Sequence, residues 1–373
     1  MLVSLSKRKD ISKIYCLVRA KDQEEATSRL AKVFQFHDDF FDKNKVIAVA
    51  GDLLDQDLPT KLSENNNLKD INLIIHSAAN TSFSKIYDSL VEKVNIDGLR
   101  SILEWSKTLK SLETFTYIGT ATICGGAECN RLVKEDESPS LNAKHLVKYT
   151  YTKMMGELML PQYLPQEKIL VLRPSIVMGD SRPWIPRSPV ILWALATMNL
   201  LRLVPVNPMS QIDIIPVDYA INSMISLLFA KRKYNVYHIS SGITSATNTL
   251  KVTSKLEKYF EDKPSFNFIN SDCIGQIKKY ARNPHQLAEN SELFKYPLYL
   301  DYWKTSVGEN GQMRILFAGI EPYFRFIELG QIFDNKRLME DSGMPPSPPA
   351  HQYIETCMKY LEKIDIFEGA LDP

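Results

Sequence analysis

Five short segments in the first half of the chain are apolar throughout, and helical patterns separate them. They are IYCLV (14–18), KVIAVAGDL (45–53), NLIIHSAA (72–79), TFTYIGT (114–120) and ILVLRPSIV (169–177). A strand with one face in water alternates apolar and polar residues, whereas a strand covered on both faces does not. Alternation of such strands with helices predicts an α/β fold with a doubly wound, Rossmann-like parallel sheet.

The helical patterns between these strands cover residues 23–36, 85–110 and 146–160, and a helix at 217–230 and a strand at 235–240 follow. From about residue 245 the sequence is mixed, aromatic and poorly periodic. We therefore predict two domains. Residues 1–240 form a dinucleotide-binding domain, and residues 241–373 form a smaller, mainly helical substrate or lid region that ends in an amphipathic helix over 351–364.

Composition narrows the class of function. The 373 residues carry 45 Lys and Arg against 44 Asp and Glu, a net charge of +1 without the basic excess of nucleic-acid-binding proteins. The five cysteines are scattered without a CxxC pair, so we expect no metal site or disulfide framework, and a reducing, cytoplasmic setting.

The longest apolar run is PVILWALATMNLLRLV, residues 189–204. It is too short to span a bilayer, and Asn199 and Arg202 interrupt it, so no transmembrane segment is predicted. The run predicts a buried or substrate-facing helix, with peripheral contact to a membrane surface as the alternative.

Charged residues near the first predicted strand suggest a phosphate site. In a dinucleotide fold the ligand lies beyond the carboxyl ends of the strands, and an arginine after the second strand accommodates the 2′-phosphate of NADP. Arg19 ends the segment 14–18, and Arg29, ten residues later, can reach the same phosphate. The alternative for Arg19 is an ordinary solvated arginine.

Other residues at strand ends fit the rest of a flat cofactor. Asp52 can accept a hydrogen bond from an adenine amino group, or it can form an Asx turn. Small Ala78 and Ala79 allow a close approach of the cofactor, or they pack beneath a helix. Pro174 and Ser175 end the segment 169–177.

Tyr149 and Lys153 are the candidate catalytic pair. Their spacing of four residues places both on one face of a helix. A phenol has an ordinary pKa of about 10, and a nearby ammonium lowers that pKa by favouring the phenolate. A second pair with the same spacing, Tyr259 and Lys263, lacks this context and is interpreted as a solvated helix face.

Two further polar residues complete the candidate site. Thr120 ends the strand 114–120, where its hydroxyl can hydrogen-bond a reacting carbonyl and stabilise developing negative charge. Asn95 lies in the predicted helix near the mouth of the site and can order a water for proton return.

As a set, several stretches resemble an extended short-chain dehydrogenase/reductase of the thioester reductase and fatty acyl-CoA reductase branch, with its male-sterility-type NAD(P)-binding domain. The stretches lie within about residues 1–240, and the aromatic segment near 323–344 is only faintly similar. They are IYCLVRA, AGDL, IIHSAANTSF, VNIDGLR, YIGTATICGG, YTYTKMMGE, LRPSIVMGD and IDIIPVDYAIN.

The resemblance implies NADPH-dependent reduction of an acyl thioester, held on CoA or on an acyl carrier protein, to an aldehyde and sometimes on to an alcohol. It implies that Thr120, Tyr149 and Lys153 are the catalytic triad. The cofactor residues that it implies, with their neighbours, are Arg19, Arg29, Asp52, Leu53, Ala78, Ala79, Asn80, Asn95, Pro174 and Ser175.

One departure from the family concerns the pyrophosphate. The family begins with a strand and a glycine-rich G-x-x-G-x-x-G turn that cradles the pyrophosphate, and residues 1–20 contain no such motif. We therefore expect the first strand to be missing, a gap or a re-paired edge between segments 14–18 and 72–79, and weak NADPH binding. Three interpretations stay open: a thioester reductase whose recorded sequence lacks its N-terminus, another extended reductase such as a nucleotide-sugar epimerase or dehydratase, and a catalytically inactive relative that acts as a binding protein.

Overall fold

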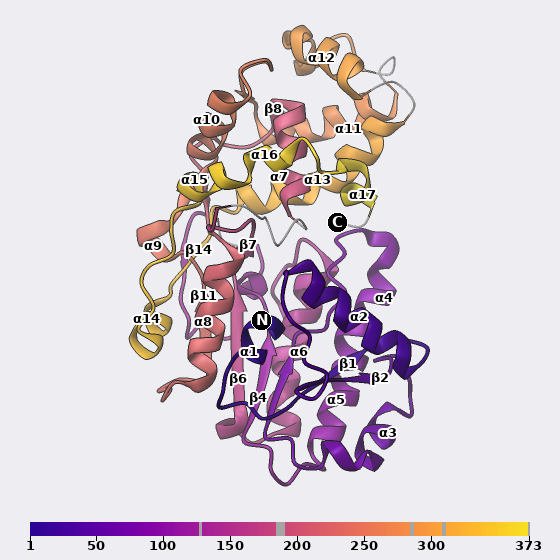
Figure 1. The fold of residues 1–373 in the computed structure, drawn as a ribbon. Coiled ribbons are helices and arrows are strands. Elements are labelled where there is room, and N and C mark those ends of the chain that lie inside the picture. The colour runs from indigo at the N-terminus through magenta and orange to yellow at the C-terminus, as the bar shows by residue number, and fades with distance from the viewer. Residues whose placement is uncertain (127–128, 184–190, 284–286, 308–310, 372–373) are drawn as a thin grey trace.

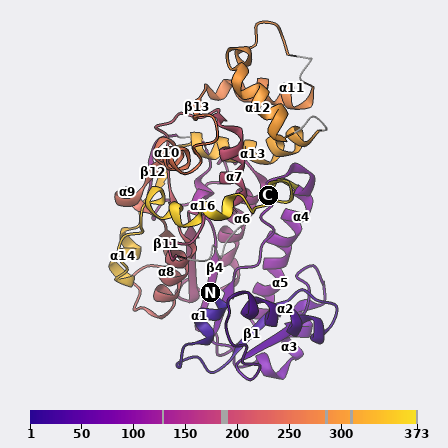
Figure 2. The same cartoon turned by 45° about the horizontal axis from the view of Figure 1, so that its top comes forward.

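The computed structural model describes residues 1–126, 129–183, 191–283, 287–307 and 311–371. Figures 1 and 2 show an elongated molecule, in which a parallel sheet with its helices forms one part and a mainly helical assembly forms the other. The helix α12 (Pro297–Val307) lies at one end and α3 (Leu58–Glu64) at the opposite end.

Four parallel strands form the central sheet, as the apolar segments predicted. Side chains alternate between its two faces: Ile169 and Val171 lie in one hydrophobic cluster, and Leu170 and Leu172 lie in another. Because both faces are buried, no polar residue is needed at every second position. The strands, in order across the sheet, are β11 (Val236–Ile239), β6 (Ile169–Pro174), β4 (Thr114–Ile118) and β3 (Leu73–His76).

The strands β1 (Ile14–Val18) and β2 (Val46–Ala50) form a separate parallel pair. Within the described residues, β1 pairs only with β2 and β3 pairs only with β4, so the expected gap between β1 and β3 is present. Leu5 of the short helix α1 (Leu2–Ser6) is buried in a cluster that also contains Ile14 and Leu73. Apolar side chains of the N-terminal segment thus pack beside both β1 and β3. No backbone hydrogen bonds join these two strands directly.

Helix α2 (Gln23–Phe36) is specified by an N-terminal cap and by a buried apolar face. Asp22 caps its first turn by accepting a hydrogen bond from the Glu25 backbone N–H at 2.8 Å. Ala26, Leu30 and Phe34 recur every four residues and are buried against β2. The other helices of this part are α4 (Asp88–Glu92), α5 (Gly98–Ser106), α6 (Lys148–Tyr163) and α8 (Val217–Phe229).

The second part is built around α7 (Leu192–Leu201), which is buried along nearly its whole length. The apolar run is therefore a core helix, and it packs with residues from 252 to 370 in one hydrophobic cluster. None of the helices in the described part of the chain combines the length and apolar character that a bilayer crossing needs. The helices around α7 are α10 (Thr249–Tyr259), α11 (Ile274–Arg282), α13 (Gln312–Glu328) and α17 (Ile366–Leu371). The domain boundary at residue 240 stays a prediction.

The single helix predicted over 351–364 is wrong. The chain instead forms α15 (Ala350–Tyr353), a 3₁₀ turn and α16 (Met358–Leu361). Tertiary hydrogen bonds hold the break: Tyr353 donates through its hydroxyl to the Met178 carbonyl at 2.9 Å, and Thr356 donates to the Asp180 carbonyl at 2.8 Å.

After α13 the chain returns to the sheet domain. Strand β14 (Ile332–Phe333) pairs with β5 (Leu132–Val133), and α14 (Lys336–Ser342) packs beside α8. The buried Glu135 carboxylate accepts hydrogen bonds from the backbone N–H groups of His238 at 3.0 Å and Arg337 at 2.7 Å. Burial raises the pKa of the Glu135 carboxyl to about 7.

This raised pKa predicts a pH-dependent stability. An unfolded glutamate has a pKa of about 4.3, so between that pH and 7 the folded chain holds a proton that the unfolded chain has released. The Glu135 contribution to the free energy of unfolding should therefore fall as pH rises through this range, by up to about 4 kcal/mol. Urea unfolding at several pH values should show a flatter profile for Glu135→Gln; parallel profiles would contradict the assignment.

Candidate active site

Tyr149 and Lys153 lie in the first two turns of α6, which runs against the sheet. Lys153 is 3% exposed, and its ammonium donates a hydrogen bond to the Ile118 carbonyl at 2.7 Å, at the carboxyl end of β4. The Tyr117 hydroxyl donates to the Lys153 carbonyl at 3.1 Å. Gly156 permits this close packing, because a Cβ there would lie 2.3 Å from the Tyr117 hydroxyl. The helix is thus fixed to the sheet beside its catalytic candidates.

Burial changes the acid–base properties of both side chains. It lowers the pKa of the Lys153 ammonium to about 7 and raises the pKa of the Tyr149 phenol to about 12. The shift of Tyr149 is opposite to the lowered pKa expected from a neighbouring ammonium. Desolvation dominates, and the Lys153 ammonium is directed at the Ile118 carbonyl. Tyr149 therefore keeps its phenolic proton at neutral pH.

Thr120 lies at the same end of β4, two residues beyond Ile118. It is 8% exposed, has extended backbone angles and caps a 3₁₀ turn over Ala121–Cys124. Its hydroxyl lies 3.0 Å from that of Thr122. The candidate triad thus gathers at one edge, with Thr120 placed by β4 and with Tyr149 and Lys153 placed by α6.

An aromatic cluster covers Tyr149, and sequence reasoning did not assign it to the site. The Phe83 ring lies 6.0 Å from the Tyr149 ring, 5.2 Å from Tyr323 and 5.5 Å from Phe326, measured between centroids. Tyr323 in turn lies 5.4 Å from Trp193 of α7. The only signal in the sequence for this contact was the weak aromatic pattern near residue 323. The periodicity of a helix shows which of its faces is apolar, but it does not show which loop that face packs against.

Asn95 acts as a clamp within the protein. Its amide N–H groups donate to the Asn80 carbonyl and the Thr152 hydroxyl, both at 2.9 Å, and its oxygen accepts from the Asn80 N–H at 2.7 Å. Thr152 donates onward to the Tyr149 carbonyl at 2.8 Å. Asn95 is 3% exposed and lies in a π-helical turn over Lys93–Asp97. Asn95 therefore links the loop after β3 to α6, and the water-ordering role expected for it stays a prediction.

The predicted phosphate residues do meet. Arg19 is exposed directly after β1, and the Arg29 guanidinium donates a hydrogen bond to the Arg19 carbonyl. Arg29 also lies 3.5 Å from the Glu25 carboxylate. The Arg29 guanidinium therefore lies at the backbone of Arg19, at the end of this strand, and their joint contact with a phosphate stays a prediction.

The remaining candidates for cofactor binding differ in their exposure and in the contacts that they make. The Asp52 carboxylate accepts a hydrogen bond from the Leu54 N–H at 2.9 Å, so in this structure it forms the turn given as its alternative. Leu53 packs against Gly98 of α5. Ala78 is exposed and Ala79 is half-buried. Pro174 ends β6, and the N–H of the buried Ser175 donates to the Ile239 carbonyl at 2.9 Å.

These residues fit the two ends of a nicotinamide dinucleotide. Arg19 and Arg29 suit the adenosine ribose end. The exposed Ala78 leaves the backbone after β3 open to close approach, and the buried Lys153 ammonium can reach a ribose hydroxyl. The cradle for the pyrophosphate has no counterpart in residues 1–20, which contain no glycine.

Comparison with known families decides the relationship. The family model described as male sterility protein matches residues 2–224. The chain belongs to this family. It is 26% identical to fatty acyl-CoA reductase 2 of Homo sapiens over 319 residues, covering 72% of this chain and 61% of the relative. It is 25% identical to the alcohol-forming fatty acyl-CoA reductase of Simmondsia chinensis over 351 residues, covering 70% and 68%.

The chain thus spans about three fifths of the human relative. Solved structures share the fold. The terminal R domain of the myxalamid PKS-NRPS pathway superposes with a TM-score of 0.67 at 20% identity, covering 97% of this chain and 87% of that one. UDP-glucuronic acid 4-epimerase of Bacillus cereus, in complex with NAD, superposes with a TM-score of 0.60 at 17% identity, covering 98% and 94%. The family interpretation, an extended short-chain reductase of the fatty acyl-CoA reductase kind, is confirmed.

The Asn95 clamp can be tested by its removal. Asn95→Ala leaves the Thr152 hydroxyl and both backbone groups of Asn80 without these partners in a buried site. We expect the free energy of unfolding to fall by about 2–4 kcal/mol. Chemical denaturation measures this loss, and Asn44→Ala, at an exposed asparagine, is the control that should change it little. An equal free energy of unfolding for the two variants would show that the Asn95 hydrogen bonds do not stabilise the fold.

Proposed function

We propose that the protein reduces acyl thioesters to aldehydes with NADPH, the acyl group arriving on CoA or on a carrier protein. The observation that carries the proposal is the half-buried Tyr149, placed by α6 with the buried Lys153 at the carboxyl edge of the sheet where Thr120 ends β4. The family match and the fatty acyl-CoA reductase relatives support the same chemistry.

The residues divide the work of one reduction. Arg19, Arg29 and Lys153 would hold the dinucleotide, which would supply a hydride for the thioester carbonyl carbon. Tyr149 donates its phenolic proton to the carbonyl oxygen as negative charge develops there, and Thr120 donates a hydrogen bond to the same oxygen. Lys153 donates one N–H to the Ile118 carbonyl, and its remaining N–H can bond the ribose beside Tyr149. The hemithioacetal formed then loses its thiol and leaves an aldehyde, and a second reduction would give the alcohol.

The apolar surroundings suit an acyl chain. Phe83, Tyr323, Phe326 and Trp193 form a continuous aromatic contact from Tyr149 to α7. A nucleotide-sugar substrate would need hydrogen-bonding groups where these rings stand, so the epimerase alternative is disfavoured. The separate β1–β2 pair is the observation that keeps a catalytically inactive binding protein as the second candidate.

Removal of the proton donor tests the mechanism. Tyr149→Phe should lower kcat for palmitoyl-CoA-dependent NADPH oxidation by about 10²–10⁴-fold and leave NADPH binding intact, because only the donated proton is lost. Tyr151→Phe, in the same helix and with its ring edge-on to that of His145, is the matched control. Full activity of Tyr149→Phe would overturn the mechanism, and an unaltered chain that binds NADPH without thioester-dependent oxidation would favour the inactive alternative.

The choice of cofactor can be tested at Arg19. Arg19→Ala should weaken NADPH binding by about tenfold to a hundredfold and change NADH binding little, because only NADPH carries the 2′-phosphate. Tryptophan fluorescence titration measures both affinities. Lys21→Ala, an exposed cation two residues away, controls for net charge. Equal loss for both dinucleotides would remove Arg19 from the phosphate site.

A further inference from the structure

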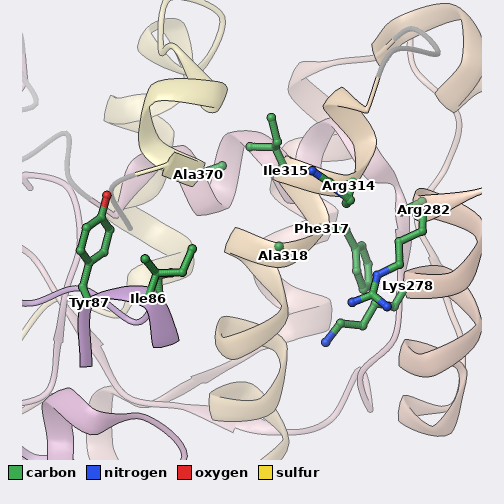
Figure 3. A pocket seen from close by; sticks show the side chains of 11 residues that line it. Ile86, Tyr87, Lys278, Arg282, Arg314, Ile315, Phe317, Ala318 and Ala370 are labelled. Carbon is green, nitrogen blue, oxygen red and sulfur yellow. The ribbon is translucent and has the colours of Figure 1, made fainter. Parts of the chain in front are cut away.

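A pocket of about 640 Å³ lies between the two parts of the molecule, outside the residues assigned to the reaction. One wall is the segment 84–87, and the others are α11, α13 and the end of α17. Figure 3 shows Ile86 and Tyr87 on one side and Lys278 on the other, with Ala318 of α13 between them. The volume falls in the range of sites that bind small molecules.

The charge of this pocket is one-sided. Lys278, Arg282 and Arg314 line it, and no acidic residue of the described part of the chain does. Lys278 is already paired with the Glu321 carboxylate at 2.6 Å. Arg282 and Arg314 are exposed, and neither makes an ion pair with another described residue. Two guanidinium groups that no described carboxylate pairs with, beside apolar lining residues, suit a ligand with a phosphate and an uncharged arm.

The pocket adjoins the catalytic edge through two elements. Ser84 lines the pocket, and its neighbour Phe83 contacts the Tyr149 ring. Helix α13 begins at the pocket with Arg314 and reaches Phe83 with Phe326. Twelve residues of helix separate these two side chains, a rise of about 18 Å.

We propose that this pocket binds the phosphate end of a phosphopantetheine-linked acyl donor, with Arg282 and Arg314 holding the phosphate. The extended arm is about as long as five residues of polypeptide, about 17 Å, which matches the distance that α13 covers. The thioester at its far end would then lie near Tyr149. The inference rests on the proposed function, and phosphopantetheine is the chemistry that CoA and a carrier protein share.

Calorimetric binding to the full chain, without NADPH or turnover, tests the pocket. The probes are CoA, 4′-phosphopantetheine and pantetheine. Unaltered protein should bind both phosphorylated probes at least tenfold more tightly than pantetheine, with an affinity that falls as salt is added. Arg282→Gln/Arg314→Gln should weaken those two probes by tenfold or more and leave pantetheine unchanged. Arg100→Gln/Lys304→Gln removes the same charge from distant exposed sites and should change nothing.

The possible results answer two separate questions: whether the pocket binds the phosphate, and whether the phosphopantetheine arm belongs to CoA or to a carrier protein. Tighter binding of CoA than of 4′-phosphopantetheine supports the site with CoA as donor, and equal binding supports it with a carrier protein. Unchanged CoA affinity in the pocket variant, or equal affinity for pantetheine and CoA, overturns the inference. Because these measurements need no catalysis, a failure of thioester reduction with CoA binding intact would refute the proposed function and leave the pocket standing.

Discussion

The hydrogen bond from the buried Lys153 ammonium to the Ile118 carbonyl is the contact on which the candidate site depends. It joins α6 to the carboxyl end of β4, and the Tyr117 hydroxyl reinforces the joint from the strand side. Tyr149 is therefore held where Thr120 ends the strand. The same burial that makes this contact tight lowers the pKa of Lys153 and raises that of Tyr149. Position and protonation state thus share one cause, the exclusion of water between helix and sheet.

The helical part completes the site from outside the sheet. Tyr323 and Phe326 of α13 reach Phe83 over Tyr149, while β14 and α14 return to the sheet and fasten this part there. Two buried carboxylates hold β14 and α14 against the sheet by accepting backbone hydrogen bonds. Asp213 accepts the N–H groups of Ser241 at 2.8 Å and Phe333 at 3.1 Å, and Glu135 serves His238 and Arg337 in the same way. An acyl group bound near Tyr149 would thus lie between two parts that the fold keeps together.

The sequence pattern predicted helices and strands correctly where a segment carries its own signal of burial or of helical periodicity. The strand at 14–18 and the helix at 23–36 match the structure residue for residue, because a two-face-buried strand and a capped amphipathic helix each carry their own signal. The helix expected over 351–364 failed, since hydrogen bonds from Tyr353 and Thr356 to the loop at 178–180 outweigh helix period. The hydrogen bonds of Asn95 to Asn80 and Thr152 were not predicted, because these partners lie 15 and 57 residues away along the chain and no local spacing indicates them.

The sequence by itself determined the α/β class, the family and the gathering of Thr120, Tyr149 and Lys153, because parallel strands bring their carboxyl ends to one edge. Only the tertiary structure decided how β1 and β3 are arranged, with apolar residues of the N-terminal segment packed beside two separate sheets. It also decided that rings from α13 lie over the Phe83 ring that contacts Tyr149, and that burial raises the pKa of the Tyr149 phenol. The reason is physical: desolvation and long-range packing depend on which distant segments meet, and no local pattern of residues records that.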